Sequence, residues 1–149
     1  DMEAWVWTVP KAHSKGGEKI VRPVPEAMRS FIEILHDETK SSGYLLGVVK
    51  NSEAVSQWGR SVYKKLGHSE PWTLHDLRRT LATHMNNMGI APHVVEQLLG
   101  HSMPGVMAIY NRSLYLPEKL DALNKWYDRL ELLAGNHQNV VLLPVANRD

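Results

Sequence analysis

The sequence predicts a mainly α-helical fold that carries a small antiparallel β-hairpin. Two observations support this fold class. Near the start of the chain, two short segments rich in β-forming residues flank a turn-forming segment. From residue 25 onward, apolar side chains recur at helical spacing in segments bounded by capping residues, proline or glycine. The 149 residues fit one domain, which at this length can bury a core without disulfides or bound metal.

The expected hairpin lies at the start of the chain. Residues 5–9 and 19–24 are the expected strands, because both segments are rich in β-branched and aromatic residues. The turn is expected at Ser14-Lys15-Gly16-Gly17, where serine and two glycines favour tight backbone geometry. This arrangement places Lys15 at the tip of the hairpin.

Two helices are expected after the hairpin. Pro25 suits the first position of an amphipathic helix over residues 25–40. Residues 44–49 are apolar and short, and we expect them to be extended. Ser52 is then the expected N-cap of a second helix, which stops at Gly67.

A third helix is expected to begin after Thr73, because Asp76 follows at the spacing of a capping-box variant. Its apolar stripe lies before a glycine and consists of Leu74, Leu77, Leu81, Met85 and Met88. Two helices are expected next, one from Pro92 to Gly100 and one that is capped by Ser102 and carries Tyr110. A long amphipathic helix over residues 116–135 and a β-like segment over residues 139–144 are expected to follow.

The composition excludes several classes of chemistry. Without cysteine the chain has no disulfide framework, no cysteine-based zinc site and no thiol nucleophile. No apolar run approaches the roughly 20 residues that span a bilayer, and the first residues lack the basic start of a signal peptide. We therefore expect a soluble protein without a membrane partner. The net charge of +1 hides two basic groups, at Lys11, Lys15, Lys19, Arg22 and Arg29 and at Arg60, Lys64, Lys65, Arg78 and Arg79.

A small set of residues carries the candidate chemistry. His75 and Arg78 share a face of a helix start, where backbone amides favour anions and a guanidinium can grip two phosphate oxygens. His101 follows the glycine that ends the next helix, and Tyr110 lies nine residues later. Each residue alone is also typical of a structural cap, a surface ion pair or a core tyrosine, but the four in this order favour attack on a phosphodiester. Metal is not expected, because His75 and His84 are nine apart on opposite sides of a helix.

These segments resemble the catalytic core of the tyrosine recombinases, the phage integrase family of DNA breaking-rejoining enzymes. Residues 98–102, Leu-Leu-Gly-His-Ser, with Tyr110 nine positions after His101, look like the family's Leu-Gly-His-Ser segment and nucleophile. Residues 75–80, His-Asp-Leu-Arg-Arg-Thr, look like its His-x-x-Arg box.

The resemblance implies site-specific DNA recombination through a covalent 3′-phosphotyrosyl intermediate, with no cofactor. Tyr110 would attack the scissile phosphate, while Arg78, His75 and His101 would stabilise the transition state. In the family a lysine on a β-hairpin protonates the leaving oxygen, and Lys15 occupies the matching position. The candidate contacts to the DNA backbone are Lys11, Lys19 and Arg79, the last of which could instead form a salt bridge.

One departure from the family pattern affects the expected activity. The family has an earlier arginine in an Ala-x-Arg-x-x-Glu-like context, and Arg22, Arg29 and Arg60 are in the wrong context to replace it. We therefore expect residues 1–135 to be a partial catalytic domain, truncated before the first catalytic arginine. Loss of one hydrogen-bond donor to the transition state typically lowers the reaction rate by roughly 10²–10³, so an isolated fragment without this arginine would be poorly active.

The resemblance also implies partners and location. Double-stranded DNA with attachment sites is the expected substrate, bound by a tetramer in a cytoplasmic, bacterial or phage-encoded complex. The tail over residues 136–149 is expected to dock as a strand, either on a neighbouring protomer or on this chain's own hairpin. Two alternatives to an integrase remain open: a type IB topoisomerase, and a non-catalytic DNA-binding or regulatory module with the same fold.

Overall fold

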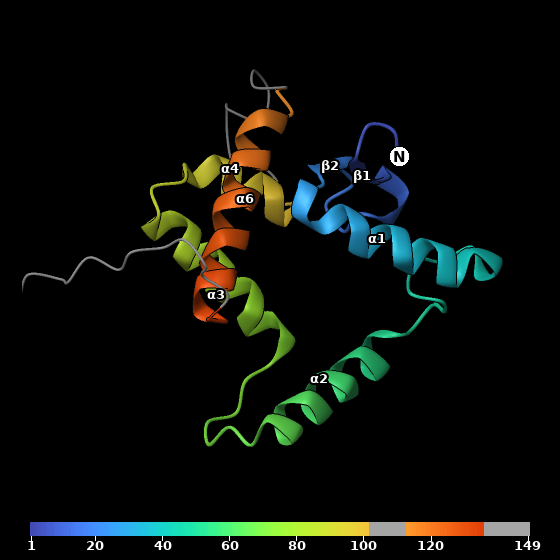
Figure 1. Ribbon diagram of the computed structural model, residues 1–149, viewed down its shortest axis with the longest axis vertical. Helices are drawn as coiled ribbons and strands as arrows, with labels where there is room; N and C mark the ends of the chain where they lie inside the picture. Colours follow the sequence, from blue (N-terminus) through green and yellow to red (C-terminus); the bar gives the residue numbers. More distant parts are fainter. Residues whose placement is uncertain (102–112, 136–149) are drawn as a thin grey trace, which may run out of the picture.

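The structure is a computed structural model that describes residues 1–101 and 113–135 (Figure 1). The described part is mainly helical with one two-stranded antiparallel sheet, so the expected fold class is confirmed. Its elements in order are β1 (Val6–Val9), the 3-10 helix η1 (Lys11–His13), β2 (Ile20–Pro23), α1 (Glu26–Thr39), the 3-10 helix η2 (Lys40–Ser42), α2 (Ser52–Leu66), α3 (Leu74–Asn87), α4 (Pro92–Leu99) and α6 (Leu116–Leu133).

The hairpin forms where the sequence predicts it. Val6 pairs with Pro23 and Val9 with Ile20, so β1 and β2 are in register along their whole length. The connection contains η1 and then a turn, in which the Gly17 amide donates to the Ser14 carbonyl at 3.0 Å. Gly17 has a φ of 68°, which glycine adopts without a steric penalty.

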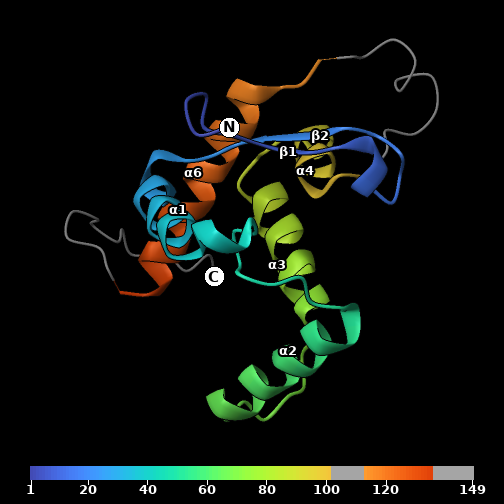
Figure 2. The same ribbon diagram turned by 90° about the vertical axis from the view of Figure 1, so that its right-hand side faces the viewer.

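The hydrophobic core lies between α3, α4 and α6. Its buried members are Met85, Ile90, Val94, Val95, Leu98 and Ala122. α4 is central because Val94, Val95 and Leu98 place one helical face between the two longer helices. β2 lies against both α4 and α6, which attaches the hairpin to this core (Figure 2).

A buried lysine joins α6 to the hairpin. The side chain of Lys119 is only 2% exposed, and its Nζ donates to the Val21 carbonyl at 3.1 Å. Burial lowers the pKa of the Lys119 ammonium, and the nearby Arg22 guanidinium lowers it further. The hydrogen bond satisfies a carbonyl of β2 where the strand lies against α6.

Local expectations were wrong at three places. Residues 44–49 form no strand: residues 44–48 are turns and bends, and Leu46 is 76% exposed. In the described part β1 and β2 pair only with each other, so this segment has no partner strand. Asn51, not Ser52, is the N-cap of α2, and its Oδ1 accepts from the Ala54 amide at 2.8 Å. Pro25 is the residue before α1, which begins at Glu26.

The two helices α1 and α2 contribute little to the core. α1 contains no buried residue, and in α2 only Gly59 is buried. Leu74 at the start of α3 packs on Gly59, where an added Cβ would lie 2.8 Å from the Leu74 Cγ. Both views show α2 standing away from the group of α3, α4 and α6 (Figures 1 and 2).

Part of the expected structure falls outside the described residues. The helix expected from Ser102 to Tyr110 and the β-like segment over residues 139–144 lie there. The expected domain division at residues 135 and 136 coincides with the end of the second described range, and it stays a prediction.

We predict that two members of the expected apolar stripe of α3 differ in their effect on stability. Met85 is fully buried, so Met85→Ala should lower the free energy of unfolding by about 2–5 kcal/mol through lost burial and a cavity. Leu77 is 54% exposed, and Leu77→Ala on the same helix should change it by no more than about 0.5 kcal/mol. Urea denaturation measures both. Equal losses would contradict the described orientation of α3.

Candidate functional site

The first turn of α3 is held by a cap whose residues the sequence identified. The Thr73 amide and hydroxyl both donate to the Asp76 carboxylate, at 2.9 and 2.7 Å. These hydrogen bonds lower the pKa of Asp76, and Arg79 contributes less to the same shift. The expected cap is therefore confirmed, and it sets the orientation of the turn that carries His75 and Arg78.

The end of α4 fixes the position of His101. Gly100 has a φ of 75°, and its amide donates to the Gln97 carbonyl at 3.1 Å. The His101 amide turns back to the Glu96 carbonyl at 2.9 Å. This pair of bonds is a Schellman motif, which requires a left-handed residue at the position of Gly100. The turn directs the chain back over the last turn of α4.

Arg78 and His101 come together at this helix end. The Arg78 Nη2 donates to the Leu99 carbonyl and lies 2.9 Å from the His101 Nε2. On its other side, the His101 Nδ1 contacts the Glu96 carboxylate. The two residues from separate motifs are thus in direct contact. The side chain of Arg78 is partly buried, whereas His101 is accessible to solvent.

A second guanidinium, from β2, lies beside the first. The Arg22 Nε donates to the Leu98 carbonyl at 2.6 Å, and its guanidinium lies 5.4 Å from the centre of the Trp7 ring. Burial lowers the pKa of Arg22, and the charge of Arg78 lowers it further. Consecutive carbonyls of α4 therefore accept from two arginines, which places two positive charges at this helix end.

Sequence reasoning missed the place of Arg22. The sequence places Arg22 in a basic group and outside the context of the family's earlier arginine, but it does not show which surface β2 faces. The alternation along the strand contained a signal, because Ile20 and Arg22 point to one face. Both side chains lie close to Gly100: a Cβ added there would be 2.5 Å from the Ile20 Cδ1 and 3.3 Å from the Arg22 Nη2.

Two other predicted site residues, His75 and Lys15, form no hydrogen bond or ion pair within this cluster. His75 is exposed and makes neither a hydrogen bond nor an ion pair with Arg78 or His101. Lys15 is exposed in the hairpin turn and likewise does not contact them. The nucleophile candidate Tyr110 lies outside the described residues.

The predicted DNA-backbone residues are all accessible. Lys11 and Lys19 are exposed on the connection between the two strands. Arg79 forms an ion pair with Asp76, with 3.3 Å between Nη1 and Oδ1 and an arginine side chain that is 74% exposed. The salt bridge considered for Arg79 is therefore present, and the exposure of its guanidinium leaves room for a second partner.

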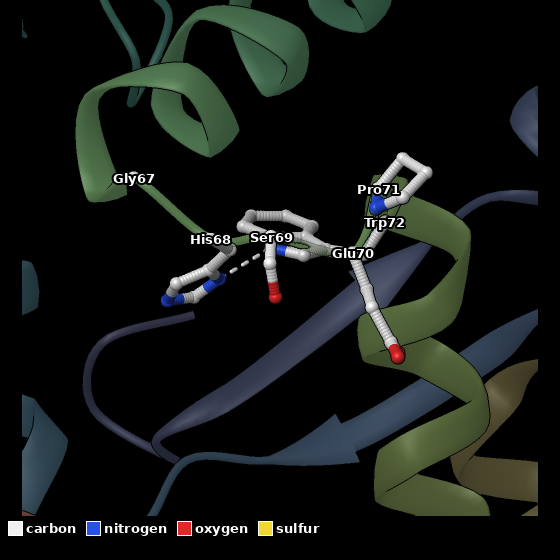
Figure 3. A pocket seen from close by; sticks show the side chains of 6 residues that line it. All are labelled: Gly67, His68, Ser69, Glu70, Pro71 and Trp72. Carbon is white, nitrogen blue, oxygen red and sulfur yellow. Dashed lines mark hydrogen bonds between the residues drawn. The ribbon is translucent and has the colours of Figure 1, made fainter.

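An open hollow between α2 and α3 does not contain the site. Six consecutive residues, 67–72, line it (Figure 3). The Trp72 indole N–H donates to the His68 Nδ1 at 2.8 Å, and the Trp72 ring meets the Tyr63 ring edge-on. Because none of the predicted site residues lines this hollow, we place the candidate site at the end of α4.

Two further classes of feature are absent from residues 1–101 and 113–135. There, no three histidine or acidic side chains are grouped so that they could hold a metal ion. Nor does any helix in these ranges have the length and apolar character needed to cross a membrane.

Comparison with known proteins places the chain in a family. It belongs to the phage integrase family, whose sequence profile matches residues 1–116. It is 31% identical over 124 residues to the tyrosine recombinase XerA of Pyrococcus furiosus, covering 74% of this chain and 41% of that protein. It is 28% identical over 114 residues to the prophage integrase IntZ of Escherichia coli, covering 72% of this chain and 28% of that protein.

The match therefore spans less than half the length of these relatives. No solved structure matches the chain. The family assignment confirms the resemblance inferred from the His-x-x-Arg and Leu-Gly-His-Ser segments.

We predict a pH-dependent contribution of the Asp76 cap to stability. The pKa of Asp76 is lowered in the folded protein, so its stabilising effect is complete above the ordinary Asp pKa of about 3.9 and is lost as pH falls through the lowered value. Asp76→Ala should therefore destabilise the protein at pH 6, and the difference from wild type should shrink on acidification below about pH 3.9. Thermal unfolding at several pH values measures this. A difference that grows on acidification would contradict the cap.

Proposed function

We propose that this chain provides strand-cleaving machinery of a site-specific tyrosine recombinase that acts on double-stranded DNA. The observation that carries the proposal is the contact between Arg78 and His101, with Arg22 beside it, at the end of α4. A phosphate at this surface would meet guanidinium and imidazole groups held by backbone carbonyls and a helix-ending turn. The membership of the phage integrase family supports the same chemistry.

In the proposed reaction, the phenol oxygen of Tyr110 attacks the scissile phosphorus and passes its proton to the His101 imidazole. The bond between phosphorus and the 5′ oxygen breaks, which leaves a 3′-phosphotyrosyl link and a 5′-hydroxyl that receives its proton from Lys15. Arg78 and His75 stabilise the charge that develops on the phosphate oxygens, and His101 assists proton transfer. The covalent link conserves the phosphodiester energy, so a hydroxyl of another strand can reverse the step without a nucleotide cofactor.

DNA contacts outside the cleavage site would position the duplex. Lys11 and Lys19 on the hairpin connection and Arg79 on α3 are exposed cations that could neutralise backbone phosphates. Contacts of this kind release counterions, so binding through them falls with increasing salt and is insensitive to base sequence. Recognition of an attachment site would require base contacts in addition.

The nucleophile can be tested by covalent trapping. We predict that a full-length protein containing this chain forms an SDS-resistant adduct with nicked duplex DNA, because the nick lets the cleaved strand diffuse away before religation. Tyr110→Phe should abolish the adduct, since phenylalanine lacks the attacking oxygen. Tyr115→Phe, which changes the next tyrosine along the chain, is the matched control and should retain it.

The other results of this experiment are informative. An adduct that persists in Tyr110→Phe, or that peptide mass spectrometry maps to Tyr115, would exclude Tyr110 as the nucleophile. Salt-sensitive DNA binding without any adduct would instead support a non-catalytic DNA-binding module. Relaxation of supercoiled DNA without strand exchange between duplexes would support a type IB topoisomerase.

We further propose that the protein acts as a tetramer on two attachment sites and that residues 136–149 contribute to its assembly. An apolar, β-like segment can add to the sheet edge of a neighbouring protomer. Deletion of residues 136–149 should then weaken self-association on DNA, as measured by sedimentation velocity. Unchanged association would favour pairing of the tail with this chain's own hairpin.

A further inference from the structure

Glu96 is a charged residue of the site that the sequence analysis did not single out. It lies on α4, one helical turn before Gly100, and its carboxylate contacts the His101 Nδ1. We propose that Glu96 is a positioning residue that holds the His101 ring in one orientation and one tautomer for strand cleavage. The role in cleavage rests on the proposed recombinase function, whereas the contact itself does not depend on it.

The first argument is that Glu96 holds His101 at two points. The Glu96 carbonyl accepts from the His101 amide at 2.9 Å, and the Glu96 carboxylate contacts the ring. The backbone bond belongs to the Schellman motif at Gly100, so the main chain of His101 is fixed first. The carboxylate then limits rotation of the ring about its remaining side-chain torsions. A histidine at a solvent-accessible helix end would otherwise sample several rotamers.

The second argument is that the partners on the two sides of the ring select one tautomer. An ionised carboxylate can only accept a hydrogen bond, so the His101 Nδ1 facing Glu96 carries the proton. A guanidinium can only donate, so the His101 Nε2 facing Arg78 presents its lone pair. Both contacts therefore favour the same neutral tautomer. The His101 Nε2 lone pair therefore lies beside Arg78, where the phosphate is proposed to bind.

The third argument concerns charge. Arg78 reaches His101 from α3, and Arg22 reaches the neighbouring Leu98 carbonyl from β2. Among the described residues, the carboxylate of Glu96 is the one that contacts His101, and the other side of the His101 ring contacts Arg78. The Glu96 side chain is 45% exposed, so it is screened by solvent and its influence is local. Orientation of the ring, and not overall stability, is therefore its expected contribution.

The contact can be tested without DNA by nitrogen-15 NMR of the histidine rings. Wild type should show the tautomer of His101 with the proton on Nδ1. Glu96→Gln should keep this signature, because the amide oxygen still accepts the hydrogen bond. Glu96→Ala should weaken this signature and show exchange between ring states, because only the Arg78 contact then favours this tautomer. Gln97→Ala, which changes the next residue on α4, is the matched control and should show the wild-type signature. The far-ultraviolet circular dichroism of every variant should match that of wild type, which shows that the helices are retained.

The role in cleavage is tested with the same variants on nicked duplex DNA. We expect Glu96→Ala to slow adduct formation by about 10- to 100-fold, because a misplaced reacting group loses alignment, while the DNA concentration for half-saturation stays unchanged. Glu96→Gln should recover most of the rate.

Two results would overturn the proposal. One is an unchanged His101 signature in Glu96→Ala, which would show that the carboxylate does not hold the ring. The other is a loss of DNA affinity that accounts for the whole effect on adduct formation, which would make Glu96 a binding residue. If the NMR result is as expected but wild type forms no adduct, the role in cleavage is rejected together with the proposed function, and the holding of the ring by Glu96 stands.

Discussion

The hydrogen bonds from Arg22 and Arg78 to the last carbonyls of α4 are the interaction on which the site depends. A helix end leaves its final carbonyls without partners inside the helix, and a buried carbonyl without a partner is costly. Here the Leu98 carbonyl accepts from Arg22 and the Leu99 carbonyl from Arg78. The need to satisfy one helix end therefore brings a strand, a helix and two positive charges together. The negative end of the α4 dipole offsets part of their mutual repulsion.

Gly100 connects this helix end to His101. Its left-handed backbone allows His101 to fold back over α4, and its missing side chain leaves space for Ile20 and Arg22 of β2. The same glycine thus serves the turn and the packing of the hairpin. An arrangement of this kind couples the position of the imidazole to the position of the sheet, because both are set by contacts with one backbone segment.

The elements that hold the site are also the elements that form the core. α3, α4 and α6 share the buried cluster, and β2 is attached to them through Lys119 and Arg22. α1 and α2 are more exposed and carry none of the contacts at the end of α4. Arg78 and His101 are thus supported by the elements of the core, while α1 and α2 lie outside it. Such support suits a site in which guanidinium and imidazole groups must be held in a fixed geometry.

The sequence by itself determined the features that depend on a few neighbouring residues. The hairpin turn, the cap formed by Thr73 and Asp76, and the turn at Gly100 could all be predicted, because their signals lie within one turn of backbone. The same local motifs identified Arg78 and His101 as candidates. Residues 44–49 misled the local reasoning, because an apolar run becomes a strand only where a partner strand is available.

Only the tertiary structure decided which distant groups meet. Arg22 reaches the Leu98 carbonyl across 76 positions of sequence, and no local pattern encodes that contact. Leu77 is exposed and Met85 is buried on the same helix, and this difference likewise depends on which part of α3 packs against α4 and α6. The physical reason is that turns and caps are satisfied by bonds over a few residues, whereas the neighbours of a charged side chain depend on how whole elements pack.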